Sequence, residues 1–172
     1  MPLINVWFYE PGPGDKWLNT LVNTYDPPYS HCDVQFVDDK MASSVFQYEK
    51  VYWKQRKFSR PGYKKITVSV NDQPYNKAYS MCAERAKQGF DFDAIGMYLL
   101  PASHILPINR DKKTFCSKHC TEVLQMAELR AVNGVFANEV TPSALYTLLA
   151  SSAVIHAEPS PLSGLRIEAP AK

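Results

Sequence analysis

The residues best suited to covalent chemistry lie between Thr114 and Ala127, in the stretch TFCSKHCTEVLQMA. Apolar residues recur there with the spacing of one helical face, and that face includes Cys116 and Cys120. Thr114 is a suitable N-cap, so Cys116 is expected in the first helical turn. Unpaired N–H groups and the positive end of the helix dipole favour a thiolate there. This position therefore predicts a nucleophile that attacks carbonyl carbon.

A cysteine also has a purely structural interpretation, because a free thiol often behaves as a small buried hydrophobic side chain. Cys120 lies one turn further into the expected helix, in line with Val123 and Leu124. Because the dipole acts mainly within the first turn, we expect Cys116 to be reactive and Cys120 to be buried and inert. Nothing in the chain resembles a secretory signal, so we expect its four cysteines to be reduced.

A nucleophilic thiol works with a base, and the chain has four histidines. His156 borders the C-terminal tail and His104 lies in an apolar, proline-flanked loop, so both are expected to be surface or structural residues. His119 could touch Cys116 from the next turn, but a base on the same helix presents a nucleophile poorly to substrate. His31 begins an alternating strand beside a carboxylate, which makes it the best candidate. It would take the thiol proton and return it to the leaving group, while main-chain N–H groups stabilise the oxyanion.

The elements that must position these residues come as strands first and helices later. Strands are predicted at Leu3–Tyr9, His31–Val37, Met41–Tyr48, Val51–Phe58 and Lys65–Val70. Helices are predicted at Asp15–Thr24, Gln73–Gly89, from Cys116 onward and at Thr141–Ala150. This order is typical of an α+β fold in which an antiparallel sheet packs against helices. We expect one domain over residues 1–157 and a disordered, proline-rich tail over 158–172.

Composition narrows the function classes. The chain has 172 residues with 45% hydrophobic and 12% aromatic content, which fits one globular domain. A net charge of +2 gives no expectation of nucleic acid as a partner. The densest basic run, Lys54–Lys65, is explained by a solvated strand face and a turn. No stretch of 18 uninterrupted apolar residues occurs, so no membrane span is expected.

Four short motifs, taken in order, resemble the circularly permuted NlpC/P60 branch of the papain-like superfamily. They are Ser30-His31-Cys32-Asp33-Val34, the Phe-Asp-Phe-x-x-Ile-Gly stretch at Phe90–Gly96, Phe115-Cys116-Ser117 at a helix start, and Thr-Pro-Ser-x-Leu-Tyr at Thr141–Tyr146. In the permuted branch the histidine strand precedes the nucleophile helix, as it does here. The resemblance implies a papain-like fold and a thiol hydrolase or acyltransferase that forms an acyl-enzyme. Members occur in bacteria, phages and large viruses. Because no secretory signal is recognised, a cytoplasmic location is expected, in the host cell if the source is viral.

The resemblance assigns Cys116 as nucleophile and His31 as base. The family's third polar residue, which orients the imidazole, usually lies on the strand after the histidine strand, and this chain has no carboxylate or histidine there. Ser44 and Gln47 on that strand remain candidates. Asp33, which shares a strand face with His31, is the other.

The identity of the nucleophile also has an alternative within this resemblance. The family usually carries an acidic residue soon after its Cys-Ser pair, where this chain has Lys118. Aligning Cys120 with the family nucleophile instead would place Glu122 near that position. That alignment leaves the Phe-Cys-Ser motif at Cys116 unexplained, so Cys120 is kept as the alternative nucleophile.

Two other functions remain open. The missing third residue is compatible with a catalytically inactive papain-like domain that binds a partner. Cys116, His119 and Cys120 could instead be zinc ligands, with His31 or Cys32 completing a set of four. A Cys-x3-Cys pair within one helix is a poor zinc motif, so we expect no metal and no cofactor. The family acts on peptides, peptidoglycan-stem amides and lipid esters, which makes a peptide or acyl-bearing substrate the expected partner.

Overall fold

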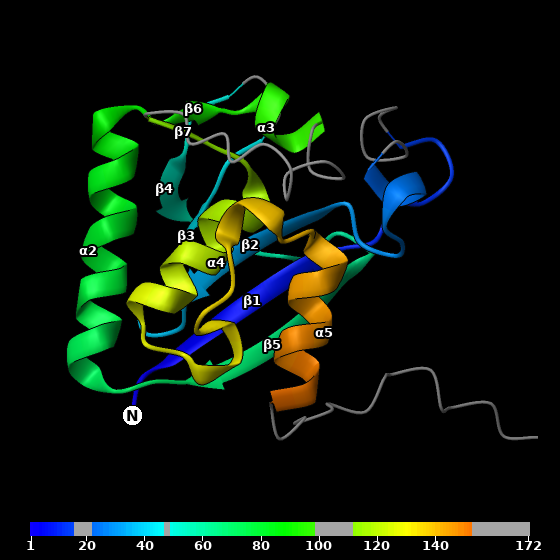
Figure 1. Ribbon diagram of the computed structural model, residues 1–172. Coiled ribbons are helices and arrows are strands. Elements are labelled where there is room, and N and C mark those ends of the chain that lie inside the picture. Colours follow the sequence, from blue (N-terminus) through cyan, green and yellow to red (C-terminus); the bar gives the residue numbers. More distant parts are fainter. Residues whose placement is uncertain (16–21, 47–48, 99–111, 153–172) are drawn as a thin grey trace, which may run out of the picture.

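The computed structural model describes residues 1–15, 22–46, 49–98 and 112–152 (Figure 1). These residues form an α+β fold with a five-stranded antiparallel sheet, as the sequence predicts. The strand order is β4-β3-β2-β1-β5. The strands are β1 (Leu3–Tyr9), β2 (His31–Phe36), β3 (Met41–Ser44), β4 (Tyr52–Gln55) and β5 (Tyr63–Ser69).

The register of the central strands places the first candidate residue at the end of the sheet. Strand β1 pairs with β2 so that Tyr9, its last residue, lies opposite His31, the first residue of β2. The strands β3 and β4 are shorter than predicted. Their pairing ends at Ser44 and Tyr52 because the N–H of Val51 turns away and donates to the carbonyl oxygen of Phe90 at 2.8 Å.

Helices and short segments complete the described chain. They are α2 (Asp72–Gln88), β6 (Asp91–Phe92), α3 (Ala94–Tyr98), β7 (Lys113–Thr114), α4 (Cys116–Met126), η2 (Arg130–Val132), η3 (Ala137–Glu139) and α5 (Pro142–Ser152). Two predicted helix boundaries are confirmed. Helix α2 ends at Gly89, whose φ of 69° is left-handed. Thr141 caps α5 by accepting a hydrogen bond from the N–H of Ala144 at 3.0 Å.

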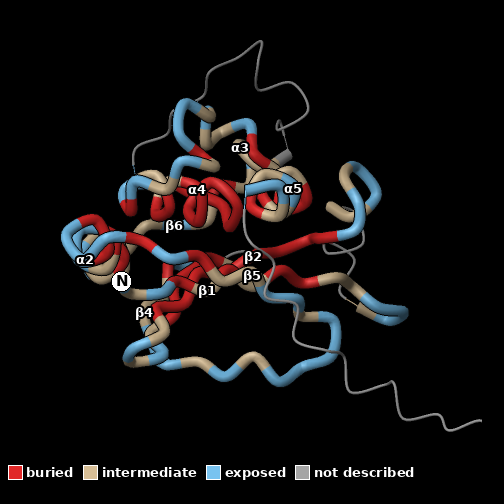
Figure 2. The backbone as a smooth tube through the Cα atoms, turned by 90° about the horizontal axis from the view of Figure 1, so that it is seen from below, coloured by how far each residue is buried: buried red, intermediate tan, exposed pale blue. Residues whose placement is uncertain are grey.

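Helices α4 and α5 lie together on one face of the sheet (Figure 2). The core between these helices and the sheet is apolar. It includes Val6, Phe8, Val34, Phe36, Val123, Leu124, Leu145 and Leu149. An aromatic cluster joins the sheet to α2, because Phe36 packs edge-on against Trp53, Tyr75 and Tyr79. Cys32 lies on this core face of β2, as its strand alternation predicts.

The connection between β4 and β5 crosses the opposite face of the sheet. Phe58 stacks on Trp7 with ring centroids 4.6 Å apart. The side chain of Gln35 bonds both to the indole of Trp7 and to the main-chain oxygen of Arg56. The basic run that was expected to be a solvated strand face is therefore partly a cover for β2. That prediction was wrong for Arg56, which lies against buried residues.

Helix α4 departs from the sequence expectation in two ways. Its N-cap is Phe115, and Thr114, the predicted cap, belongs to the short strand β7. Ser117 and Lys118 lie off the predicted apolar face, so they were expected to be exposed, but both are buried. The reason is tertiary: α4 contacts β2, β3, α2, α5, η2 and η3, so little of its surface reaches water.

Some expectations fall outside the described residues. These are the tail at 158–172, Gln47, His104, His156 and residues 16–21 of the predicted helix at Asp15–Thr24. Within that predicted range Asp15 is described and is not helical, whereas residues 22–24 are helical. Among the helices that the structure does describe, none is long and apolar enough to cross a membrane.

Candidate functional site

The structure brings Cys116 and His31 together although they are far apart in the sequence. Cys116 is the first residue of α4, and His31 is the first residue of β2. The imidazole contacts the Cys116 sulfur, and both residues line a cavity of about 490 Å³. Cys116 is 8% exposed and His31 7%, so each reaches the cavity through a small part of its surface.

The start of α4 explains why a thiolate is stable at Cys116. Phe115 has extended backbone angles, with φ of −127° and ψ of 167°, and makes no side-chain cap bond. The first helical hydrogen bond runs from the N–H of His119 to the carbonyl oxygen of Phe115 at 2.8 Å. The N–H groups before it have no intrahelical acceptor, so they give this end of the helix its partial positive charge.

Asp33 lies on the same face of β2 as His31 and is fully buried. Its Oδ2 approaches Nε2 of His31 to 3.3 Å. The two atoms lack the alignment of a linear hydrogen bond, so the contact is an ion pair between a carboxylate and an imidazolium. The other carboxylate oxygen, Oδ1, accepts hydrogen bonds from Arg56 Nη1 at 3.0 Å and from the hydroxyl of Tyr52.

Arg56 is held in an aromatic cage. Its guanidinium carbon lies 4.7 to 5.7 Å from ring centroids, and the four rings are those of Phe46, Tyr52, Phe58 and Tyr63. Arg56 Nη2 also donates to the Tyr63 hydroxyl at 2.9 Å. Phe46 stacks in turn on His31, with ring centroids 4.5 Å apart. The cage therefore fixes both the cation that faces Asp33 and the plane of the imidazole.

Cys32 reaches the site from the core face of β2. Its thiol contacts the sulfurs of Cys116 and Cys120, and its main-chain N–H also bonds to the Cys116 sulfur. Cys32 and Cys120 are fully buried. Three sulfur atoms therefore meet at the junction of β2 and α4, and of these three residues only Cys116 lines the cavity.

These contacts separate the acid–base properties of the three groups. Hydrogen bonding with the Cys32 thiol and the positive charge of His31 lower the pKa of Cys116 well below its ordinary value, although burial alone would raise it. Burial alone would lower the pKa of His31, but the negative charges of Asp33 and of the Cys116 thiolate outweigh it and raise that pKa to about 10. Burial raises the pKa of Cys120. The arrangement favours a thiolate–imidazolium pair at neutral pH.

The candidates for the third residue are separated by position. Asp33 lies against the imidazole, as described above. The hydroxyl of Ser44 donates to the main-chain oxygen of Cys32 at 2.7 Å, so it supports the strand end and not His31. Gln47 lies outside the described residues.

Both ring nitrogens of His119 bond to residues other than Cys116. Its Nδ1 accepts a hydrogen bond from Arg85 Nη1 at 3.3 Å, which leaves the ring proton on Nε2 to bond Ser43 Oγ at 2.9 Å. Burial and the charge of Arg85 lower the pKa of His119 to about 3, so the ring is neutral. Glu122, the acidic residue of the alternative alignment, pairs with Arg85 at 2.7 Å. Both residues therefore support the packing of α4 on α2.

His119, one of the zinc ligands considered above, has both ring nitrogens engaged by Arg85 and Ser43. Among the residues that the structure describes, no group of three or more histidine, cysteine, aspartate or glutamate side chains is arranged to hold a metal ion.

Sequence reasoning missed Tyr52 and Arg56 as parts of the site, and it named Cys32 only as a possible zinc ligand. Because Cys32 lies on the opposite strand face from His31, strand alternation gave no sign that its thiol contacts Cys116. Arg56 follows Tyr52 at a spacing of four residues within the basic run, which offered no signal that either side chain points at Asp33.

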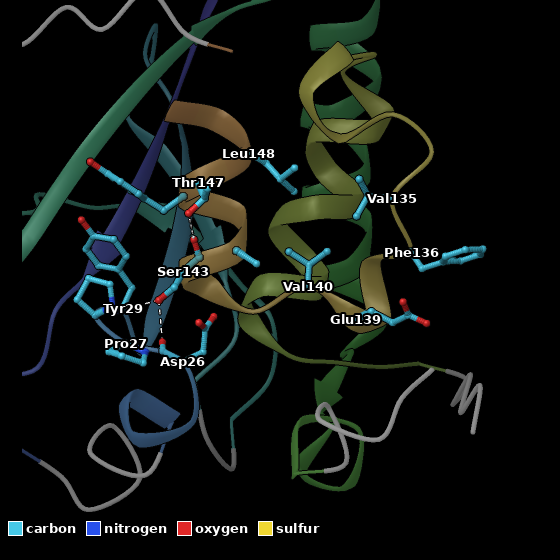
Figure 3. Close-up of a pocket in the computed structure, with 13 residues that line it drawn as sticks. Asp26, Pro27, Tyr29, Val135, Phe136, Glu139, Val140, Ser143, Thr147 and Leu148 are labelled. Carbon is cyan, nitrogen blue, oxygen red and sulfur yellow. Dashed lines mark hydrogen bonds between the residues drawn. The ribbon is translucent and has the colours of Figure 1, made fainter. Parts of the chain in front are cut away.

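A second cavity, of about 710 Å³, lies between α5 and the segment before β2 (Figure 3). Ser143 lines this cavity. Its Oγ donates to the main-chain oxygen of Asp26 at 2.7 Å and accepts from the N–H of Tyr29 at 3.0 Å. Its lining includes no cysteine, histidine or lysine. This hydroxyl is engaged in joining two segments, so the cavity at Cys116 is the better candidate for chemistry.

Comparison with protein-family models, with curated protein sequences and with solved structures found no significant match for this chain.

Proposed function

We propose that the protein is a thiol hydrolase or acyltransferase in which Cys116 is the nucleophile, His31 the general acid–base group and Asp33 the residue that orients His31. The observation that carries the proposal is the meeting of a helix-start cysteine with an imidazole that is paired to a buried carboxylate, at the wall of a cavity. We further propose the permuted papain-like architecture, in which the histidine strand precedes the nucleophile helix. The chain order of β2 and α4 supports it.

The reaction follows from these positions. The Cys116 thiolate attacks the carbonyl carbon of a peptide, amide or ester, and N–H groups at the start of α4 stabilise the negative oxygen. His31 gives its proton to the leaving amine or alcohol, and an acyl-enzyme remains on Cys116. His31 then removes a proton from water in a hydrolase, or from another acceptor in an acyltransferase, and that nucleophile releases the acyl group.

Asp33 supports both proton transfers. Its charge favours the imidazolium form, and its contact with Nε2 leaves Nδ1 as the ring nitrogen for the Cys116 sulfur. Arg56 and Tyr52 occupy the remaining carboxylate oxygen, so Asp33 stays in place while His31 changes its protonation state. A cysteine nucleophile depends less on such support than a serine does, because its thiolate is already formed.

The cavity favours an uncharged or partly apolar acyl group. Aromatic rings form much of its wall, namely Tyr9, Phe46, Phe58, Tyr63 and Phe92. Besides His31 the lining carries three basic side chains, Arg56, Lys57 and Arg60, and two acidic ones, Asp15 and Glu49. Arg56 pairs with Asp33 and Arg60 with Asp15. Charges of both signs are therefore present, which favours no anionic substrate, and a peptide or acyl ester is the substrate class we propose.

A thiol-directed electrophilic probe with an acyl-like carbonyl, such as a peptidyl chloromethyl ketone, tests the assignment. The native protein should be labelled at Cys116, and peptide mapping locates the adduct. His31→Ala should slow labelling by at least about tenfold, since general acid–base groups contribute about 10²–10⁴.

Cys82→Ala is the matched control. Cys82 is a buried thiol on α2 whose pKa burial raises to about 12, so its loss should leave labelling unchanged. Equal labelling of several cysteines, or none at Cys116, would reject the catalytic assignment and favour a binding domain. Faster labelling of Cys120 would transfer the nucleophile to that residue.

A further inference from the structure

The proposed hydrolysis uses one of the three sulfurs that meet at the site. The thiol of Cys32 lies behind Cys116, on the core side, and contacts its sulfur. Neither proton transfer of the proposed reaction needs this thiol. A second thiol in contact with a cavity-facing thiolate has a chemistry of its own, because the two can form a disulfide when one of them is oxidised.

Access to the three sulfurs is unequal. Cys116 lines the cavity, so a small oxidant can approach its sulfur and an added oxygen atom has space. Cys32 and Cys120 are fully buried and do not line it. Burial and the neighbouring cysteines raise the pKa of Cys32, which keeps it a thiol while Cys116 is the thiolate. Oxidation should therefore begin at Cys116.

We propose that Cys116 is a site of reversible peroxide oxidation and that Cys32 is its resolving cysteine. The Cys116 thiolate attacks hydrogen peroxide, the O–O bond breaks, and a sulfenic acid forms on Cys116. The departing hydroxide takes a proton from the His31 imidazolium and leaves as water. The sulfur loses two electrons and the peroxide gains them.

The second step joins the two sulfurs. The sulfur of Cys32 attacks the sulfenic sulfur of Cys116, and the S–O bond breaks as the S–S bond forms. The proton of the Cys32 thiol leaves with the released hydroxide as a second water molecule. Reduction by an external dithiol restores both thiols, so the nucleophile is protected from irreversible oxidation to sulfinic acid.

Geometry favours Cys32 over Cys120 as the resolving residue. Cys116 and Cys120 are four residues apart on one helix, where Cβ atoms are about 5–6 Å apart. A disulfide requires Cβ atoms at about 3.5–4.5 Å, so this pair would have to distort α4. Cys32 comes from a separate element and its thiol contacts the Cys116 sulfur across the β2–α4 junction, so joining these two sulfurs places no distortion within one helix.

The inference rests on the proposed function in one respect, the thiolate at Cys116. Its readout needs no substrate, so the two proposals can fail separately. Selective acyl labelling of Cys116 without disulfide formation would leave the hydrolase standing and end the redox proposal. A Cys32–Cys116 disulfide without acyl labelling would do the reverse.

The experiment treats the full-length protein with a small molar excess of hydrogen peroxide. Free thiols are then blocked with N-ethylmaleimide, and the protein is digested without reductant for mass spectrometry. The wild-type protein should yield a Cys32–Cys116 linked peptide pair, which dithiothreitol removes. This measurement requires no variant, so it holds even if a substitution impairs folding.

Variants then assign the roles. Cys32→Ala should lose the linked pair and accumulate Cys116 sulfinic acid, which dithiothreitol does not reverse. Cys120→Ala should retain the Cys32–Cys116 pair at the wild-type level. Sulfinic acid at Cys116 in the wild-type protein under the same exposure, or a Cys116–Cys120 link, would overturn the proposal.

Discussion

Asp33 Oδ2 lies 3.3 Å from Nε2 of His31, while the other oxygen of the same carboxylate is held by Arg56 and Tyr52. One buried carboxylate thus joins two basic side chains that line the cavity, His31 and Arg56. The imidazole can change its protonation state while Arg56 and Tyr52 hold the carboxylate in place. This relationship decides how the following substitutions should behave.

Replacing Asp33 with Asn should reduce the reactivity of Cys116. The amide keeps the shape of the carboxylate but removes the charge that helps to raise the pKa of His31. Less imidazolium means less thiolate, so alkylation of Cys116 by iodoacetamide at pH 7 should slow by about 10- to 100-fold. The rate constant as a function of pH measures this. In the variant the midpoint of this pH profile should move up towards the ordinary cysteine pKa of about 8.5. An unchanged profile would show that Asp33 has no role in forming the thiolate.

The Cys116–His31 pair should stabilise the fold most between pH about 6.5 and 8.5, the ordinary pKa values of the two groups. The pKa of Cys116 is lowered in the folded state, so its contribution is complete above pH 8.5 and is lost as pH falls. The pKa of His31 is raised to about 10, so its contribution is complete below pH 6.5 and is lost as pH rises towards 10. Between pH about 6.5 and 8.5 the gain from Cys116 offsets the loss from His31, so the summed contribution is constant there and forms a plateau. It declines below pH about 6.5 and above pH about 8.5.

Chemical denaturation across pH 5 to 10 measures that plateau. The free energy of unfolding of wild type minus that of the double variant Cys116→Ser/His31→Asn isolates the pair, with slopes of up to about 1.4 kcal/mol per pH unit outside the plateau. The difference for Cys82→Ser serves as a comparison and should not show this profile. A difference for the double variant that is constant across the range would mean that folding shifts the pKa of neither side chain.

Arg56→Met should destabilise the protein by about 3 kcal/mol, because it leaves the charge of Asp33 buried with fewer partners. The side chain of Arg56 is 22% exposed and Asp33 is fully buried, so water cannot fully replace the lost contact. Arg60→Met is the matched control. Arg60 pairs with Asp15 while 64% exposed, and its loss should change the unfolding free energy little. Equal losses in the two variants would show that the burial of Asp33 does not make its pairing with Arg56 stronger than the exposed Arg60–Asp15 pair.

Gly62→Ala should cost about 2 kcal/mol more than Gly14→Ala. Both glycines have left-handed backbone angles, with φ of +94° and +84°, so both variants bear conformational strain. A Cβ at Gly62 would lie 2.6 Å from the main-chain oxygen of Glu10, whereas nothing lies within 4 Å of one at Gly14. The difference between their free energies of unfolding isolates the steric contact, and similar values would mean that the turn before β5 yields easily.

Local patterns in the sequence predicted the elements well where the pattern itself forms the structure. Alternation placed Cys32 on the core face of β2 and His31 with Asp33 on the other. Gly89 ended α2 because only a residue that tolerates positive φ fits there, and Thr141 capped α5 with its own hydroxyl. Each of these outcomes depends on residues within a few positions of one another, which is the range that sequence spacing reports.

The composition of the site depended on contacts between distant segments, which no local pattern encodes. Spacing alone could nominate Cys116 and His31, but their meeting required α4 to pack on β2. Arg56 belongs to a basic run whose composition predicts a solvated surface. It pairs with Asp33 only because the β4–β5 connection crosses the sheet. The protonation states of Cys116 and His31 were likewise decided by tertiary structure. A pKa depends on burial and on charges within a few ångströms, whichever part of the chain supplies them.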